Sequence, residues 1–207
     1  SSLLKALTGY EAYIKDQLFA TLDTTTKKIR LDNNMEILIS DTVGFLRNLP
    51  HDLIASFRST LGEIEDCDLI IKLIDITTND ISGHIQTIDD TLKFLNCENK
   101  EYLIVFNKID AVKDSTIYDR LQNMYPESIF ISSLKELRLN NLLDSIKAHC
   151  TQNLPVHEIK IPHHNSSIVK EIYNHAIIIT RKDDYDNICI KIQCSNDVYE
   201  KIKKKMI

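Results

Sequence analysis

The sequence has few of the residues that interrupt regular structure, with only four Gly and four Pro among 207 residues, and it has no Trp. No apolar run approaches the ~18 residues of a membrane-spanning helix, so none of these residues is predicted to cross a membrane in that form. Hydrophobic residues make up 43% and charged residues 27%, which excludes a mainly disordered chain. The length predicts one large domain, or one medium domain with a small appendage.

Excess positive charge is also missing, because the formal net charge is −5. No overall attraction to nucleic acid follows, although this balance leaves room for local basic patches. The five Cys are odd in number and scattered, without metal-type spacing, so we expect reduced thiols in a bacterial-type cytoplasm. The pair His163-His164 has no ligand-type neighbour and is assigned to the surface. We assign the Lys-rich run 201–205 to a solvated helix end, with contact to RNA as the alternative.

Strand-like and helix-like apolar patterns alternate over the first 150 residues. Two short runs, 27–32 and 35–40, flank Asn33-Asn34, which tolerate the positive φ of a tight turn, so we expect a hairpin. Apolar runs at 69–76, 102–106 and 128–131 predict buried strands, and this order predicts a mainly parallel, three-layer α/β sheet. Helical stripes are carried by Leu3, Leu7, Tyr10 and Ile14; Leu53, Phe57, Leu61 and Ile64; Ile81, Ile85, Ile88, Leu92 and Leu95; Ile117, Leu121 and Met124; and Leu139, Leu142, Leu143 and Ile146.

The pattern changes after residue 150. Residues 151–155 are predicted to be a linker, followed by a small α+β domain over 156–207 in the order β-α-β-β-α. Its predicted parts are a strand at 157–161, a helix carrying Ile168, Val169, Ile172 and Tyr173, two strands, and a last helix at 197–205. The second of the two strands alternates cleanly through Ile188, Ile190, Ile192 and Cys194, which predicts one buried face, and Ser195 is suited to cap the last helix.

The tetrapeptide Asn107-Lys108-Ile109-Asp110 directly follows a buried strand, where ligands bind in open α/β sheets. Guanine presents two adjacent donors, and one carboxylate can accept both, so Asp110 is suited to read guanine. Adenine places an acceptor there, and such bidentate pairing gives about 1–3 kcal/mol of discrimination. Asn107 can contact the other edge of the base or tie neighbouring loops together, and the Lys108 stem can pack over the nucleotide. Taken alone, the tetrapeptide also fits an ordinary polar loop.

Other loops carry groups suited to phosphate and Mg²⁺. Asp41-Thr42-Val43-Gly44 follows a strand, where Asp41 can hold a Mg²⁺-bound water and the Gly44 N–H can meet a terminal phosphate. A Thr hydroxyl in Phe19-Ala20-Thr21-Leu22-Asp23 can complete the Mg²⁺ coordination when a γ-phosphate is present. Each of these segments also fits a plain turn or surface loop.

Two serine pairs complete the pattern. Ser1-Ser2 before an apolar helix matches the end of G-x-x-x-x-G-K-[ST], in which the hydroxyl after Lys ligates Mg²⁺, and a simple N-cap is the alternative. Ser132-Ser133-Leu134 follows the last strand of the larger domain, where its backbone can line a base pocket. Together, Ser1, Thr21, Asp41, Asn107 and Ser132 fall in successive loops at one predicted sheet edge, so we expect a guanine-nucleotide site there.

These motifs resemble GTPases of the Obg–HflX superfamily, and in particular the HflX-type family. Residues 16–23 look like the family's switch I, and 41–53 look like its switch II with the helix that follows. The resemblance covers 1–150 as a Ras-like P-loop GTPase domain and 155–207 as a small C-terminal domain. It implies binding of GTP and GDP with Mg²⁺, slow hydrolysis to GDP and phosphate, and association with the large ribosomal subunit, in some members to split ribosomes under stress. We expect a monomer.

Position by position, the resemblance implies three groups of site residues. Catalysis is assigned to Thr21 and Gly44, and metal contacts to Ser1, Thr21 and Asp41. Phe45 stands where Ras-type GTPases carry a water-orienting Gln, so we expect slow hydrolysis that depends on a partner. Nucleotide contacts are assigned to Ser1, Ser2, Phe19, Ala20, Thr21, Leu22, Asp23, Asp41, Thr42, Val43, Gly44, Asn107, Lys108, Ile109, Asp110, Ser132, Ser133 and Leu134.

The sequence departs from the family pattern at its start, since the Gly-rich loop with its Lys, and the strand before it, would precede Ser1. We therefore expect a fragment or truncated gene product, with the first strand and P-loop of the GTPase domain lacking. For such a chain by itself we expect weak nucleotide binding and little hydrolysis. The alternative function is a non-catalytic remnant that serves as a ribosome- or protein-binding module.

Overall fold

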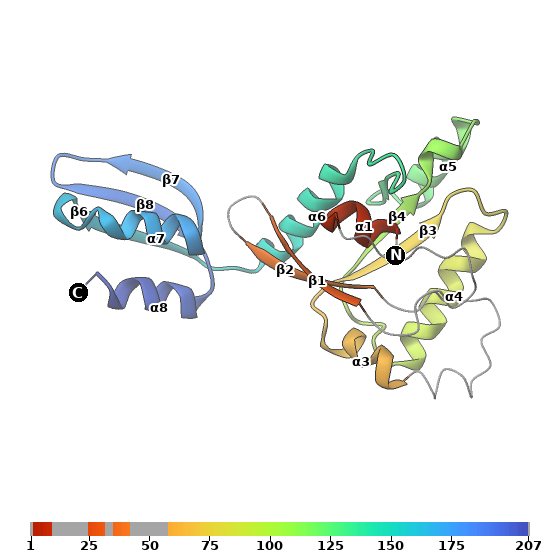
Figure 1. The fold of residues 1–207 in the computed structure, drawn as a ribbon, viewed down its shortest axis with the longest axis horizontal. Coiled ribbons are helices and arrows are strands. Elements are labelled where there is room, and N and C mark those ends of the chain that lie inside the picture. The colour runs from red at the N-terminus through yellow and green to blue at the C-terminus, as the bar shows by residue number, and fades with distance from the viewer. Residues whose placement is uncertain (1, 10–24, 32–34, 42–57, 207) are drawn as a thin grey trace. The chain divides into compact units, whose positions relative to one another are not determined.

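A computed structural model describes residues 2–9, 25–31, 35–41 and 58–206 of the chain (Figure 1). The chain divides into two compact units. The first comprises Ser1–Lys28 with Leu38–Asp144, and the second comprises Ile29–Ile37 with Ser145–Ile207. No helix in the described part of the chain is long and apolar enough to cross a membrane.

A three-stranded parallel sheet forms the centre of the first unit. Its strands are β3 (Ile70–Asp75), β4 (Tyr102–Asn107) and β5 (Ile129–Phe130), in the order β3-β4-β5. The register pairs β3 with β4 from Ile70↔Tyr102 to Asp75↔Asn107, so both strands end at the same edge. The connections are α4 (Ile81–Phe94) and α5 (Thr116–Met124), and α6 (Leu139–Gln152) follows β5. This order confirms the predicted α/β class with a parallel sheet.

The core of this sheet is aliphatic and aromatic. Phe106 on β4 has its ring centroid 5.2 Å from that of Phe130 and 5.8 Å from that of Tyr125. Burial of such rings supplies much of the free energy that holds helices against a sheet. The buried members of this cluster are Ile74, Ile76, Ile81, Ile85, Phe106, Leu121 and Phe130.

Two details of the sheet differ from the expectation of fully buried strands. Leu73 on β3 is 39% exposed, while its neighbour Lys72 is buried. The Lys72 Nζ lies 2.5 Å from the Asp89 carboxylate and 3.5 Å from the centroid of the Tyr102 ring, so its charge is compensated. An apolar run thus marks the strand correctly without establishing that both of its faces are covered.

The remaining elements of the first unit are short. Helix α1 (Ser2–Thr8) buries Leu3 and Leu4. It ends at Thr8, where Gly9 takes φ 67° and donates its N–H to the Lys5 carbonyl at 2.8 Å, and the stripe residues Tyr10 and Ile14 lie outside the described residues. Helix α3 (Arg58–Asp66) begins after the undescribed segment 42–57 and buries Ile64.

The expected hairpin is present as β1 (Thr25–Arg30) and β2 (Glu36–Asp41), which form a two-stranded sheet of their own. The Leu31 N–H donates to the Met35 carbonyl at 2.8 Å near the turn. At the other end, the Thr26 and Ser40 hydroxyls lie 2.7 Å apart. Strand β1 begins two residues before the predicted start, and Asn33-Asn34 lie outside the described residues.

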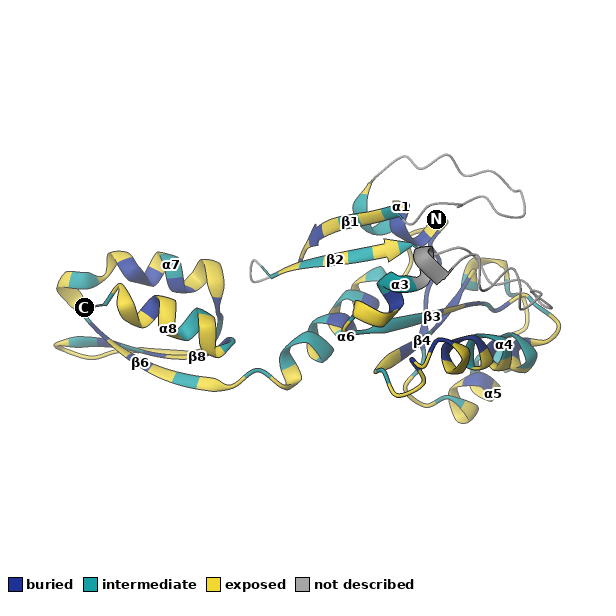
Figure 2. Cartoon of the chain, turned by 90° about the horizontal axis from the view of Figure 1, so that it is seen from below, coloured by how far each residue is buried: buried dark blue, intermediate teal, exposed yellow. Residues whose placement is uncertain are grey.

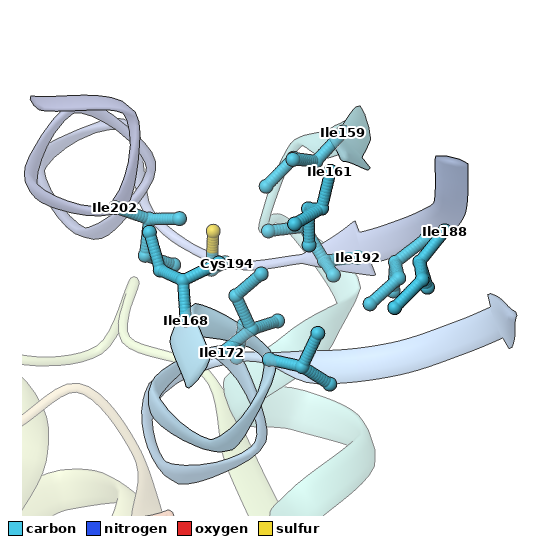
Figure 3. Close-up of a cluster of buried hydrophobic side chains, with 11 residues drawn as sticks. Ile159, Ile161, Ile168, Ile172, Ile188, Ile192, Cys194 and Ile202 are labelled. Atoms are coloured by element: carbon cyan, nitrogen blue, oxygen red, sulfur yellow. The ribbon is translucent and has the colours of Figure 1, made fainter. Parts of the chain in front are cut away.

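The second unit contains an antiparallel sheet in the order β6-β8-β7, formed by β6 (Val156–Pro162), β7 (Ile177–Asp183) and β8 (Asn187–Gln193). Helices α7 (Ser167–His175) and α8 (Asn196–Lys204) contribute to its core, and Figure 2 shows buried and exposed residues alternating along them. The core consists largely of isoleucines (Figure 3), with Ile159, Ile161, Ile168, Val169, Ile172, Ala176, Ile188, Ile190, Ile192, Cys194 and Ile202 buried.

The predicted β-α-β-β-α order and the buried alternation along β8 are confirmed. Ser195 caps α8 as expected, because its hydroxyl accepts from the Val198 N–H at 3.4 Å. One expectation was wrong in detail, because helix α6 extends to Gln152, into the segment predicted to be a linker. Tyr173 lies on α7 as predicted, and it is exposed.

Candidate nucleotide-binding site

The loops after β4 and β5 lie side by side at one edge of the parallel sheet. The Ile131 N–H donates to the Phe106 carbonyl at 2.8 Å, and the Ile109 N–H donates to the Ile131 carbonyl at 3.2 Å. The ladder therefore continues past the ends of both strands. This extension brings the predicted segments 107–110 and 132–134 next to each other.

Asn107 is the link between these two loops. Its side chain is buried, with the residue 7% exposed, and its Oδ1 accepts from the N–H of Lys108 at 2.8 Å and of Ser133 at 2.9 Å. One carbonyl oxygen thus satisfies two backbone donors that come from different loops. Of the two roles that the sequence allowed for Asn107, the structure shows the tie between neighbouring loops.

The residue after Asn107 has an unusual backbone conformation. Lys108 takes φ 67° and ψ 35°, the left-handed region that a residue with a side chain seldom adopts. A short 3-10 helix, η2 (Ile109–Ala111), follows it, and the Ala111 N–H donates to the Lys108 carbonyl at 3.0 Å. Because such a conformation is kept only where surrounding bonds enforce it, the loop is held in one shape.

Asp110 presents its carboxylate at the exposed side of this loop. Its Oδ1 accepts a hydrogen bond of 2.5 Å from the hydroxyl of Ser132, a residue with no exposed surface. The same Ser132 oxygen accepts from the Lys135 N–H at 3.0 Å. No described residue donates a hydrogen bond to Asp110 Oδ2. The carboxylate is therefore oriented at one oxygen and still able to accept further N–H donors.

The loop 132–138 closes on itself. Ser132 and Leu137 exchange two backbone hydrogen bonds, of 3.1 and 3.0 Å, and Glu136 and Arg138 take positive φ values of 53° and 57°. Leu134 at its tip is 77% exposed. The Ser133 hydroxyl is buried, and within the described part of the chain it has no hydrogen-bond partner.

Sequence reasoning missed one member of this cluster, Asp75. It ends β3 opposite Asn107, and its Oδ2 lies 2.7 Å from the Lys108 Nζ. Its Oδ1 accepts from the N–H of Thr77 at 2.9 Å and from the Thr77 hydroxyl at 2.7 Å. The signal that could have found it is the one that found Asn107, a polar residue at the end of an apolar strand.

Partial burial alone would raise the pKa of Asp75. The hydrogen bonds from Lys108 and Thr77, together with the charge of Lys108, outweigh that effect and hold the pKa of Asp75 below its ordinary value. Asp75 therefore carries its negative charge throughout the neutral range. The ion pair that it forms with Lys108 is a lasting part of the loop structure.

The predicted phosphate and metal end is described only in part. Asp41 is the last residue of β2, and Ser2 is the first residue of α1. The predicted metal contacts are all oxygen atoms, the donors that Mg²⁺ prefers, and the Asp41 carboxylate fits that chemistry. Within the described ranges, no cluster of three His, Cys, Asp or Glu side chains could hold a metal. The other predicted site residues at this end lie outside the described residues; they are Ser1, Phe19, Ala20, Thr21, Leu22, Asp23, Thr42, Val43 and Gly44.

The chain matches a family described as 50S ribosome-binding GTPase over residues 1–108. A GTPase HflX from Caldanaerobacter subterraneus subsp. tengcongensis is 32% identical over 207 residues, which is all of this chain and 47% of that protein. The chain thus spans about half the length of this curated relative.

The fold is similar to that of two proteins whose structures were solved with a bound guanine nucleotide or its analogue. One is Era in complex with MgGDPNP and nucleotides 1506–1542 of 16S ribosomal RNA, with a TM-score of 0.58 and 23% identity over 72% of this chain and 52% of that one. The other is SsGBP in complex with GDP, with a TM-score of 0.58 and 26% identity over 73% of this chain and 46% of that one.

Proposed function

We propose that this chain, which belongs to the 50S ribosome-binding GTPase family, acts as an HflX-type GTPase that binds GTP with Mg²⁺ and hydrolyses it slowly to GDP and phosphate. The observation that carries the proposal is the pair of loops joined by Asn107, from which Asp110 presents a carboxylate oriented by Ser132. A carboxylate can accept both of the adjacent donors of guanine, whereas adenine offers no such pair of donors.

The selectivity follows from counting donors and acceptors. Guanine offers a ring N–H and an exocyclic amine side by side, and the two oxygens of Asp110 can accept both. Adenine presents a ring nitrogen lone pair at this position, which would face the carboxylate and leave its outer oxygen without a donor. A bidentate match is worth about 1–3 kcal/mol against the wrong base.

The phosphate end of the site is proposed from the sequence. Ser1, Thr21 and Asp41 would hold Mg²⁺, directly or through water, and the ion would neutralise charge on the β- and γ-phosphates. The Gly44 N–H would donate to the terminal phosphate, where the absence of a Cβ allows close approach. Phe45 cannot orient a water molecule by hydrogen bonding, so turnover should depend on a partner that orders the site.

The proposed partner is the large ribosomal subunit. The family description, 50S ribosome-binding GTPase, supports this choice. Era, which has a similar fold, binds a segment of 16S ribosomal RNA, which is part of the small subunit, so the 30S particle is the alternative to be tested. Co-sedimentation with purified 50S and 30S subunits, in the presence of GDP or a non-hydrolysable GTP analogue, shows which subunit the protein binds and in which nucleotide state. Binding to 50S that requires the GTP analogue is the expected result, whereas equal recovery with both subunits would contradict it.

Nucleotide selectivity provides the direct test. The natural protein is titrated with fluorescent GDP, which is then displaced by GDP, IDP or ADP in the presence of Mg²⁺. Inosine lacks the exocyclic amine, so IDP should compete less well than GDP, and ADP should compete least. Equal competition by GDP and ADP would refute the role of Asp110.

Ribosome activation is tested separately, by measuring phosphate release from GTP with and without 50S subunits. A rate unchanged by 50S subunits would contradict it.

A further inference from the structure

An ion pair holds the side chain of Lys108 at the edge of the candidate base site. The Lys108 Nζ lies 2.7 Å from Asp75 Oδ2. Asp75 ends β3 and is paired in register with Asn107, the last residue of β4, and Lys108 directly follows Asn107. The Lys108 and Asp75 side chains are 57% and 34% exposed. A partly exposed ion pair of this kind contributes little to the free energy of unfolding by itself. Its main effect is therefore on the position of the Lys108 side chain.

Asp75 is held in place by hydrogen bonds that do not involve Lys108. Thr77 donates both its N–H and its hydroxyl to Asp75 Oδ1, at 2.9 and 2.7 Å. One carboxylate oxygen is thus used by the turn after β3, and the other is directed at Lys108. The carboxylate acts as a fixed anchor and does not need to be ordered by the lysine.

The Lys108 side chain is therefore restrained at both ends. Its backbone is fixed in the left-handed conformation at the start of η2, and its ammonium group is fixed by Asp75. In the sequence, Lys108 stands between two residues of the candidate base site, Asn107 directly before it and Asp110 two positions after it. A stem ordered in advance offers a ligand an apolar surface without the loss of side-chain freedom that binding would otherwise require.

We propose that Asp75 is a positioning residue for nucleotide binding, which acts by holding the Lys108 stem in place as one wall of the base site. This inference rests on the proposed function, since it names the residue that preorganises the same site. Asp75 touches neither base nor phosphate in this role. Its contribution passes entirely through Lys108, and this distinguishes it from a residue that merely stabilises the fold.

The test is the affinity of Asp75→Asn for fluorescent GDP and for a fluorescent non-hydrolysable GTP analogue. Asparagine keeps an oxygen for Thr77 but loses the charge that attracts Lys108. Both affinities should fall by a similar factor of about three to ten, the cost of ordering one long side chain on binding. The loss should appear mainly as faster dissociation, and Asp75→Glu should restore part of it.

The chain supplies a matched control at Asp114. In Asp114-Ser115-Thr116, the aspartate Oδ1 accepts from the Thr116 N–H at 3.0 Å and from the Thr116 hydroxyl at 2.8 Å, as Asp75 does with Thr77. No ion pair to a lysine is found for Asp114 among the described residues. Asp114→Asn should therefore bind both nucleotides like the unchanged protein.

A double-mutant cycle separates positioning from structure. In a Lys108→Met background, which keeps the stem and removes the ammonium group, Asp75→Asn should cause no further loss of affinity. The same loss in both backgrounds would overturn the inference, as would an unchanged affinity in Asp75→Asn alone. If the unchanged protein failed to prefer GDP over ADP, the proposed function would fail instead, so the two failures are distinguishable.

Discussion

The carboxylate of Asp110 accepts a hydrogen bond of 2.5 Å from the hydroxyl of Ser132, which joins the loop after β4 to the loop after β5. Ser132 is fully buried and Asp110 is exposed, so the bond connects the protein interior with the surface that a ligand would meet. The orientation of the carboxylate is therefore set before any ligand arrives. Such preorganisation is what allows one side chain to discriminate between bases.

Asp110→Asn should change the base preference of the site. Xanthine carries a carbonyl where guanine carries its exocyclic amine, and the new amide can donate to that carbonyl. The Kd for GDP should rise by about tenfold or more, in line with a bidentate pair worth about 1–3 kcal/mol, while the Kd for XDP should fall. Competition between the two nucleotides measures both changes.

Asp119→Asn on the exposed side of α5 is the control for that experiment, because it removes the same charge at a position outside the two loops. It should leave both dissociation constants unchanged. A parallel loss of GDP and XDP binding in Asp110→Asn would show that the substitution damages the loop and would argue against base reading.

Ser132 and Ser133 are adjacent serines with opposite expected responses to alanine. Ser132→Ala removes a hydroxyl that donates to Asp110 and accepts from Lys135, so it should lower the free energy of unfolding by about 1–3 kcal/mol and weaken GDP binding. Urea denaturation followed by circular dichroism measures the first effect, and GDP titration measures the second.

Ser133→Ala supplies the matched comparison, because its buried hydroxyl has no partner within the described residues. Removing an unsatisfied polar group should leave the stability of the ligand-free protein unchanged or raise it by about 1 kcal/mol. Equal destabilisation by both alanines would mean that the hydrogen bonds of Ser132 contribute nothing beyond its packing.

The charge of Asp75 predicts a pH dependence of stability. Burial raises the pKa of Asp75, but its bonds to Lys108 and Thr77 lower it further, so the folded-state pKa lies below the unfolded value of about 3.9. The stabilisation is therefore present above that value and is lost as the pH falls through the folded-state pKa. The stability difference between the natural protein and Asp75→Asn should be constant near neutrality and begin to shrink as the pH falls below about 3.9.

Thermal unfolding of both proteins between pH 7 and pH 3 measures this difference. The comparison uses the difference between variants because other carboxylates titrate in the same range and cancel. A difference that grows as the pH falls would reverse the sign and would contradict the assignment of a lowered pKa to Asp75.

Ile190→Ala tests whether the second unit has a core of its own. Ile190 is 1% exposed at the centre of the β6-β8-β7 sheet, and truncation of such a residue costs about 2–5 kcal/mol. Hydrogen exchange should increase in β6, β7 and β8, while GDP affinity should stay unchanged. Val156→Ala, at an exposed position on the same sheet, should affect neither measurement.

Much of the fold could be predicted because burial imposes a period on the sequence. The alternation of Ile188, Ile190 and Ile192 indicated a strand with one covered face, and the structure confirms it. Periodicity failed at Met124, which continues the apolar stripe of α5 but is exposed. It also could not place the end of α1, which depends on the backbone conformation of Gly9.

The candidate site likewise has features that could be predicted from the sequence and one that could not. Asn107, Asp110, Ser132 and Ser133 could be grouped from the sequence because each follows a strand, and parallel strands end at one edge. The structure brings these four together, and their role toward a nucleotide stays a prediction. Asp75 also follows this rule, as a polar residue at the end of an apolar strand, but its pairing with Lys108 depends on the register between β3 and β4, which the sequence alone does not contain.

Because a single oxygen, Asn107 Oδ1, accepts from the amides of both Lys108 and Ser133, any motion that displaces this side chain releases a bond in each loop at once. The two amides should therefore exchange their hydrogens for deuterium at a common rate, through one shared opening event. A partner that distorts either loop would loosen both at once, and this linkage offers a direct physical route by which contact at one loop could hasten nucleotide release.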